Sequence, residues 1–358
     1  LGGFDFAFTL PDTPNLGNAY IQMNLSGAPA YGYTRHSFQI QEFRRPEFEA
    51  SATAPQGPFF AGEDATIGVS ANYYAGGALP GAETNWTVTK TQSSFTPPNQ
   101  GKFTFGSWTP WWARTSSPFT PAETETFNGK TDVTGEHLLK LDFGMSTPPR
   151  PMSIRAQAVV MDVNRQTTTA TTTLLVHPSQ HYVGLRTEKY FVKKGEPLKV
   201  QGIVSDVDGN IIKDRPVKVR ASRVKYAWKN GQYDETLVDP QNCEVMSEEK
   251  EFSCTFTTAV GGSYKITAIT QDDYGRQNFT EFTRWVSGGD RPVSRNVTQE
   301  KVDLIPDQDT YKPGQKARIL VQSPFVPAEG LLTLNRNGIV EERRFTMKES
   351  TTTLEVPI

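Results

Sequence analysis

The sequence has few of the residues that build metal or catalytic centres. Two cysteines and four histidines occur among 358 residues, and no Cys-x-x-Cys pair is present, so we expect no structural zinc site. The formal net charge is −2, from 37 basic and 39 acidic residues, which provides no long-range field to hold nucleic acid or an anionic membrane. No apolar run approaches the roughly 20 residues that a membrane-spanning helix needs.

Recognisable enzyme signatures are missing as well. The chain has no Gly-x-Ser-x-Gly elbow and no glycine-rich phosphate loop, and no motif links its histidines to a nucleophile. The segment 206–210 resembles the start of a calcium loop, but the twelfth position counted from Asp206 is Val217 and not glutamate. We therefore expect polar hairpin turns there and at 272–275, no cofactor, and no enzyme activity in this chain.

The sequence does contain a dense pattern of β-strands. Apolar residues alternate with small or polar ones in many short segments, which is the period of a strand with one buried face. Threonine is abundant, and its β-branched side chain favours extended backbone. Glycine and proline interrupt these segments at short intervals, and no amphipathic helix of three turns is evident. The predicted fold class is all-β, with tandem immunoglobulin-like antiparallel sandwiches.

The two cysteines are candidates for a disulfide. Cys243 and Cys254 lie on either side of an acidic stretch, and if antiparallel strands flank that stretch the sulfurs face each other across a hairpin. The alternative is two unrelated buried thiols; we favour the disulfide. A loop of this size gives about 3 kcal/mol of stabilisation by chain-entropy estimates. The bond would place the protein outside the reducing cytosol.

Three kinds of segment recur in the same order and divide the chain. Each unit has an early aromatic–glycine turn, a late strand led by glycine and a final hairpin, and the early turns lie at Gly62, Gly195 and Gly314. The start of the sequence has no basic end and no apolar stretch, so we expect a piece of a longer protein rather than a signal peptide. The predicted units are 1–44 (late strands only), 45–178 and 179–288 (complete, seven-stranded) and 289–358 (early part only).

An insertion at 92–128, rich in proline and aromatic residues, interrupts the unit 45–178. It contains Trp108, Trp111 and Trp112. Exposed tryptophans make platforms for sugars or proteins, so one interpretation is an interaction patch. We favour the other, in which the aromatic residues fold back over their own unit, because so apolar a loop is costly to leave in water.

Several stretches together carry a family resemblance. They are 8–11 (FTLP) with 16–20 (LGNAY), 38–48 (FQIQEFRRPEF), 73–82 (YYAGGALPGA) with Asn85-Trp86, 309–314 (DTYKPG), and 103–112 of the insertion (FTFGSWTPWW). Their order and spacing, over essentially the whole chain, resemble the macroglobulin domains of the alpha-2-macroglobulin family, and of its bacterial members in particular.

The resemblance implies a function that the residues alone do not show. Such proteins trap endopeptidases: a protease cuts an exposed bait segment, the molecule rearranges, and in many members an internal thioester captures the attacker. Bacterial members are periplasmic, often lipid-anchored, and associated with cell-wall synthesis enzymes as partners. The thioester motif, a Cys followed three residues later by Gln, is absent here, since Met246 and Thr257 occupy those positions. The resemblance therefore implies a non-catalytic scaffold segment of an extracytoplasmic inhibitor, with the bacterial periplasm as the expected location.

Two rival interpretations stay open at this point. One is a cell-surface adhesin or sugar-binding array of immunoglobulin-like modules, with the tryptophans as its platform. The other is an accessory region of an enzyme whose catalytic domain lies outside this sequence. A downstream Cys-x-x-Gln motif in the full-length gene favours the protease trap, and a cell-wall anchor signal favours the adhesin.

Overall fold

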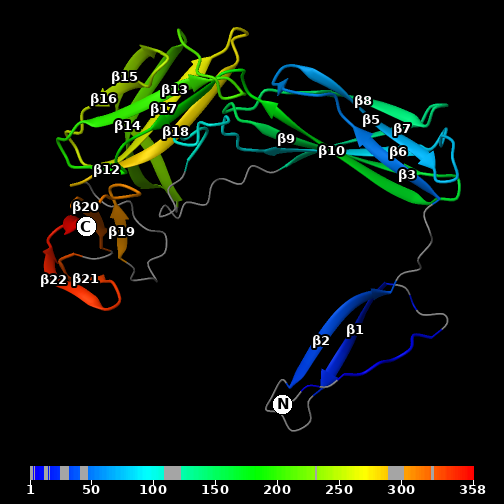
Figure 1. The fold of residues 1–358 in the computed structure, drawn as a ribbon, viewed down its shortest axis with the longest axis horizontal. Coiled ribbons are helices and arrows are strands. Elements are labelled where there is room, and N and C mark those ends of the chain that lie inside the picture. The colour runs from blue at the N-terminus through cyan, green and yellow to red at the C-terminus, as the bar shows by residue number, and fades with distance from the viewer. Residues whose placement is uncertain are drawn as a thin grey trace.

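The computed structural model describes residues 3, 5–11, 15, 17–24, 32–40, 47–108, 122–229, 232–288, 302–323 and 326–358. Every regular element in these ranges is a β-strand, which confirms the predicted all-β class for the described residues. We call residues 48–177 module A, 182–286 module B and 303–357 module C. Figure 1 shows modules A and B side by side, with module C next to module B.

Module A is a sandwich of two sheets around one hydrophobic core. One sheet has the order β3-β5-β8 and the other β4-β10-β9-β6-β7. The fully buried Trp86 lies between them, and its indole nitrogen donates a hydrogen bond to His137 Nδ1 at 3.0 Å. The strands are β3 (Phe48–Thr53), β4 (Phe59–Phe60), β5 (Asp64–Tyr73), β6 (Glu83–Gln92), β7 (Glu123–Lys130), β8 (Glu136–Asp142), β9 (Met152–Met161) and β10 (Thr167–His177).

Module B repeats this topology strand for strand. Its sheets have the orders β11-β13-β16 and β12-β18-β17-β14-β15. In both modules a two-residue strand, β4 or β12, pairs in parallel with the last strand. The prediction of seven antiparallel strands omitted it, because two residues are too few to show alternation. The strands are β11 (Tyr182–Arg186), β12 (Phe191–Val192), β13 (Leu198–Ser205), β14 (Pro216–Lys229), β15 (Gln232–Met246), β16 (Phe252–Phe256), β17 (Gly262–Gln271) and β18 (Gln277–Val286).

The repeated aromatic–glycine segments are the turns that follow these short strands. Gly62 follows β4 and Gly195 follows β12, with φ of +83° and +86°. Gly314 in module C has φ of +84°. Residues with a side chain rarely adopt this backbone conformation, so the recurrence in the sequence has a conformational cause.

Module C and the N-terminal segment are smaller. The sheets of module C have the orders β19-β20-β23 and β21-β22, and the N-terminal hairpin pairs β1 with β2. The expected unit boundaries at 44, 178 and 288 stay predictions; residues 41–46 and 289–301 lie outside the described residues. The strands are β1 (Gly17–Asn24), β2 (Tyr33–Ile40), β19 (Asp303–Pro306), β20 (Lys316–Gln322), β21 (Ala328–Asn335), β22 (Ile339–Met347) and β23 (Thr351–Pro357).

Four tight turns, which we call the Asp loops, share one device. In each, the Oδ1 of the first residue, an aspartate, accepts the amide four residues later at 2.7–3.0 Å. The residue three positions later has positive φ. The predicted turns at 206–210 and 272–275 are both present; the second joins the paired strands β17 and β18, whereas the first connects strands of different sheets. The loops begin at Asp132, Asp162, Asp206 and Asp272.

Arg165→Gly is expected to stabilise module A. Arg165 has φ of 60° at the position where the other three Asp loops have glycine. Backbone in the left-handed region costs a residue with a side chain about 1–2 kcal/mol. Glycine avoids this cost, but it loses more conformational entropy on folding, which offsets roughly half of the gain. The free energy of urea unfolding should rise by about 0.5–1 kcal/mol. The control Gly135→Ala should lower it, and a loss of stability in Arg165→Gly would contradict this account of the loops.

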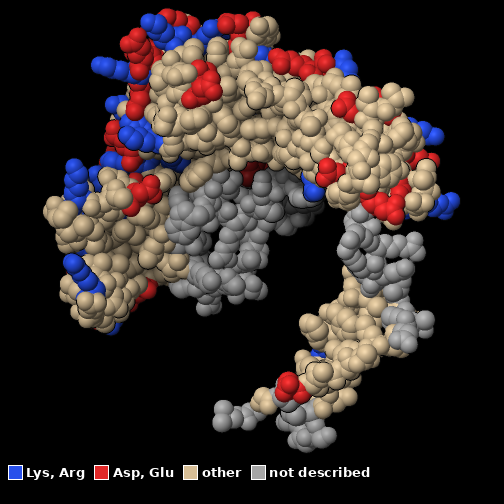
Figure 2. Space-filling view, turned by 45° about the vertical axis from the view of Figure 1, so that its right-hand side comes forward, with Lys and Arg blue, Asp and Glu red and all other residues tan. Residues whose placement is uncertain are grey.

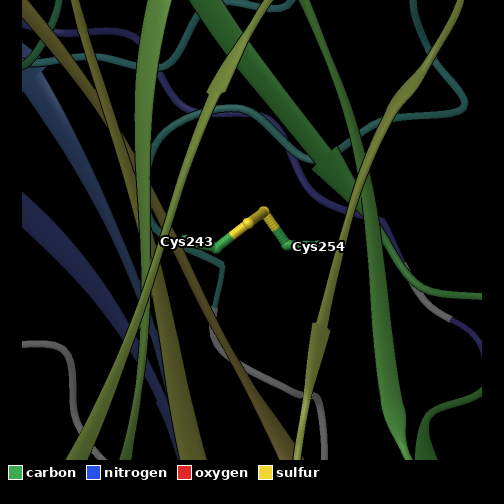
Figure 3. Close-up of a disulfide and its surroundings, with 2 residues drawn as sticks. All are labelled: Cys243 and Cys254. Atoms are coloured by element: carbon green, nitrogen blue, oxygen red, sulfur yellow. A yellow bond between two sulfur atoms is a disulfide. The ribbon is translucent and has the colours of Figure 1, made fainter.

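A disulfide joins Cys243 and Cys254, with the Cα atoms 6.1 Å apart (Figure 3). The predicted pairing is present, but its placement across a hairpin is wrong. Cys243 lies on β15 of the five-stranded sheet and Cys254 on β16 of the three-stranded sheet, so the bond connects the two sheets of module B. The chain changes sheet within the acidic stretch between the cysteines, a step that alternation of apolar residues does not reveal.

Reduction of this disulfide is expected to lower the stability of module B by about 3 kcal/mol, the chain-entropy estimate for a loop of this size. Thermal unfolding with and without reductant measures the change. Module A has no cysteine, so its transition serves as the internal control. Alkylation without reductant, followed by mass spectrometry, tests the bond itself: two alkylated cysteines in protein made under oxidising conditions would show that it does not form.

Candidate functional site: the interfaces between modules

The described residues do not assemble a metal centre. No group of three or more of their His, Cys, Asp and Glu side chains is placed to hold a metal ion. His177 and His181 stand four positions apart, a spacing used in zinc sites that the sequence reasoning passed over, but Nδ1 of His177 lies 2.8 Å from the hydroxyl of Tyr182.

No helix among the described residues is long and apolar enough to cross a membrane. On the face shown in Figure 2, acidic and basic side chains lie interspersed over modules A and B. Several charged and aromatic side chains are instead buried where the modules meet. These interfaces are the candidate functional site.

A strap from module A crosses onto module B. It consists of residues 95–108, which follow β6 and form the first part of the insertion. The amide of Thr104 donates a hydrogen bond to the carbonyl of Leu185 at 2.8 Å, and the amide of Leu185 donates back at 3.0 Å. This pair is an antiparallel bridge to β11, the outer strand of the three-stranded sheet. The Gln100 side chain adds a hydrogen bond to the carbonyl of Gly209 at 2.9 Å.

The end of the strap pairs with β18 in the other sheet of module B. The amide of Glu281 donates to the carbonyl of Gly106 at 2.9 Å, and the amide of Trp108 donates to the carbonyl of Glu281 at 3.0 Å. The Ser107 hydroxyl lies 3.0 Å from the Glu281 carboxylate, to which it donates. The short strand β12 pairs with only two residues of β18, Trp285 and Val286, and Glu281 lies outside that pairing. The strap thus supplies partners for backbone groups at the margins of both sheets.

Module B has room for the aromatic side chains of the strap. A Cβ atom on Gly184 would overlap the ring of Phe105 and crowd Phe103. Trp108 packs against the core of module B and stacks on Tyr190, with ring centroids 6.2 Å apart. The prediction that the insertion folds back over its own module is therefore wrong for the described part, which covers the neighbouring module.

This placement bears on the predicted interaction patch. Trp108 is partly buried in its contact with module B, so it does not stand free as a platform. Trp111 and Trp112 fall within 109–121, outside the described residues, and their part in a patch stays a prediction.

A histidine–tyrosine pair fills the junction between modules A and B. His177 ends β10 and Tyr182 begins β11, and Phe95 of the strap packs on both rings, at centroid distances of 4.6 and 5.1 Å. Burial among these rings lowers the pKa of His177 to about 4 and raises the pKa of Tyr182. Both side chains are therefore neutral near pH 7.

A partly buried charge network ties the same two modules together. Arg276 follows an Asp loop of module B, and its Nε donates to Asp272 Oδ2 while its Nη1 donates to Glu63 of module A, each at 2.8 Å. The guanidinium also lies 4.7 Å from the ring centroid of Phe60 in module A. The side chains of Arg276 and Asp272 are 6% and 0% exposed, so water screens this pair far less than a surface pair. Asp272 also accepts a hydrogen bond at 3.0 Å from the amide of Gln180, which lies between the last strand of module A and the first strand of module B.

Module C docks on module B through an apolar cluster flanked by polar contacts. The amide of Tyr190 donates to the carbonyl of Asp307 at 2.9 Å, and the Tyr190 hydroxyl donates to the carboxylate of Asp309 at 2.7 Å. Arg318 of module C pairs with Glu196 of module B at 3.2 Å. The buried cluster comprises Phe191, Trp285, Ile305 and Leu320.

Sequence reasoning did not find these interface residues. The one signal was the position of Arg276, which directly follows the turn noted at 272–275. Charged residues beside turns are ordinarily exposed. The alternation pattern of one module does not show which of its side chains a second module buries. The sequence therefore does not indicate that Arg276 and His177 lie in an interface.

Comparison with known proteins then identifies the modules. A family model described as the alpha-2-macroglobulin bait region domain matches residues 302–358, which correspond to module C. The alpha-2-macroglobulin homolog of Nostoc sp. is 23% identical over 333 residues, which is 90% of this chain. Together these matches support the resemblance of this chain to the alpha-2-macroglobulin family over most of its length. The bait-region match falls on the segment predicted from sequence only as the early part of another module.

Two further similarities extend the comparison. Circularly permutated Ras protein 2 of Dictyostelium discoideum is 30% identical over 287 residues, 71% of this chain. The native conformation of E. coli alpha-2-macroglobulin aligns with 96% of this chain at a TM-score of 0.50 and 14% identity, which supports the macroglobulin-type fold. This chain spans 17% of the Nostoc protein, 7% of the Dictyostelium protein and 22% of the E. coli chain.

The buried His177 is expected to make the junction acid-sensitive. Its pKa is about 4 in the folded chain and 6.5 ordinarily, so between these values the unfolded chain binds the proton first. The contribution of His177 to the free energy of unfolding is complete above pH 6.5. It falls as the pH drops towards 4, by up to about 3 kcal/mol. Urea unfolding of His177→Gln, measured from pH 7.5 to 4.5, should show a smaller loss.

The matched control is His36→Gln, in the exposed strand β2. Its pH dependence should follow that of the unmodified chain. If His177→Gln loses stability on acidification as steeply as His36→Gln does, the buried histidine is not the acid-sensitive group at this junction.

Proposed function

We propose that this chain is a non-catalytic scaffold segment of a longer inhibitor that traps endopeptidases. Its role is to hold module C, which matches the bait region domain, in a fixed position relative to modules A and B. The observation that carries the proposal is the combination of that match with the docking of module C on Phe191 and Trp285 of module B. A protease that meets the bait region would meet it at a defined place on a rigid array.

The inter-sheet disulfide supports a location outside the reducing cytosol. The bacterial periplasm is the proposed compartment, following the bacterial relatives in the comparisons. A partnership with cell-wall synthesis enzymes rests on the family resemblance alone.

An adhesin or sugar-binding array is the weaker candidate. Its platform needs exposed tryptophans, and the packing of Trp108 against module B removes one of the three from that role. Circularly permutated Ras protein 2 is not named as an inhibitor, although it is 30% identical to this chain over 287 residues. Modules of this kind are therefore not diagnostic of protease trapping by themselves, and the test must use the longer protein.

Incubation of this chain alone with trypsin is expected to give cleavage at exposed loops and no adduct that survives boiling in detergent. The described residues show no activated nucleophile, and the sequence has no thioester motif, so nothing here can form an acyl bond at a useful rate. Trypsin should keep its activity on a small peptide and stay open to a large inhibitor. A detergent-stable adduct, or selective protection from the large inhibitor, would contradict the scaffold role.

The same two assays on the full-length protein test the trapping function itself. There, trypsin should keep its activity on a small peptide and lose access to the large inhibitor. Full access of the inhibitor after trypsin has cut the full-length protein would refute the proposed function.

A further inference from the structure

Four side chains meet where the strap, module B and module C converge. Trp108 of the strap stacks on Tyr190 of module B, with the ring planes 17° apart. The guanidinium of Arg284 lies 5.1 Å from the ring centroid of Trp108 and 5.2 Å from that of Tyr190. The hydroxyl of Tyr190 in turn donates to Asp309 of module C. We call Trp108, Tyr190, Arg284 and Asp309 the three-way node.

Arg284 is a buried cation whose hydrogen bonds to the described residues go to neutral groups. The residue is 5% exposed, and its Nε and Nη1 donate to the Thr187 hydroxyl and the Thr283 carbonyl. Burial lowers its pKa to about 10, and the Asp309 carboxylate acts in the opposite direction. The charge is therefore balanced by the aromatic faces above it and by the field of a carboxylate from another module.

This arrangement makes the contacts of the node interdependent. When module C is undocked, Arg284 loses the field of Asp309 and Tyr190 loses its acceptor, so the Tyr190 ring is held less firmly against Trp108. When the strap is lifted, Arg284 loses one aromatic face and is opened to water, and the Tyr190 hydroxyl is less well directed at Asp309. Each event weakens the contacts on which the other depends, and linkage requires the effect to be reciprocal.

We propose that the three-way node couples the docking of module C to the closure of the strap, so that module A responds to whether module C is in place. The strap lies between two strands of module A in the sequence, but its backbone forms hydrogen bonds with module B. Through Tyr190 it extends to the segment that matches the bait region domain. The coupling is a property of the packing and holds independently of whether the longer protein traps proteases.

Hydrogen–deuterium exchange on the 358-residue chain tests this coupling. Tyr190→Phe keeps the ring over Trp108 but removes the hydroxyl that donates to Asp309. The strap amides of Thr104 and Trp108 should then exchange about three- to tenfold faster, the effect of losing roughly one hydrogen bond on the opening equilibrium. The deleted hydroxyl bonds to neither amide, so a purely local effect would leave both unchanged.

Asp309→Ala removes the acceptor of the same hydrogen bond and should produce a similar increase. The double variant Tyr190→Phe with Asp309→Ala should exchange little faster than either single variant, because both changes break one contact. Asp309 is exposed and Tyr190→Phe keeps the half-buried ring, so the circular dichroism spectra of both variants should match that of the unmodified chain.

The reciprocal measurement starts from the strap. Trp108→Leu should speed exchange of the Tyr190 amide, whose acceptor is the carbonyl of Asp307 in module C. The matched control Gln100→Ala removes a strap contact remote from the node, and should leave the Tyr190 amide within twofold of its original rate. Strap amides that stay within twofold in Tyr190→Phe, or equal effects of Trp108→Leu and Gln100→Ala on the Tyr190 amide, would overturn the coupling.

Discussion

The arrangement of modules A and B depends on the backbone pairing between the strap and module B. Only residues 178–181 join the last strand of module A to the first strand of module B. Domains joined in this way ordinarily move relative to each other unless their interface is large and apolar. Hydrogen bonds from the strap to Leu185 and Glu281 remove that freedom, because backbone pairing requires a fixed register where apolar contact alone would permit sliding.

The buried charges at the interfaces add specificity to this pairing. Arg276 reaches from module B to Glu63 of module A, and Arg284 lies under the strap. Because the Glu63 side chain is 49% exposed, its pair with Arg276 contributes less than the roughly 3–5 kcal/mol that is lost when one partner of a fully buried pair is removed. Arg276 keeps Asp272 of its own module in any docking, but a different arrangement of the modules would remove Glu63 from Arg276. It would also remove Trp108 of the strap from Arg284. Module B therefore acts as the hub that holds its neighbours in one arrangement, which is the property that a scaffold needs.

The sequence predicts individual modules well and their assembly poorly. Alternation, recurring glycine turns and the spacing of the two cysteines were enough for the fold class, the turns at 206–210 and 272–275, and the disulfide. They missed that Cys243 and Cys254 lie in different sheets, because alternation reports that a side chain is buried and not which sheet it faces. The insertion is predicted to cover its own module because so apolar a loop is costly in water, and this is wrong for its described part. The space for Phe105 lies at Gly184 of the other module and leaves no periodic signal in the sequence.

The most direct test of the hub arrangement is a distance measurement between modules A and B. Spin labels at Val133→Cys in module A and Val260→Cys in module B occupy exposed positions, and the native cysteines are blocked by their disulfide. Pulsed electron resonance should give one narrow distance distribution in the native background. In Gly184→Val, which fills the space of Phe105, the distribution should broaden. A distribution that is equally narrow in both proteins would contradict the claim that the strap holds module A on module B.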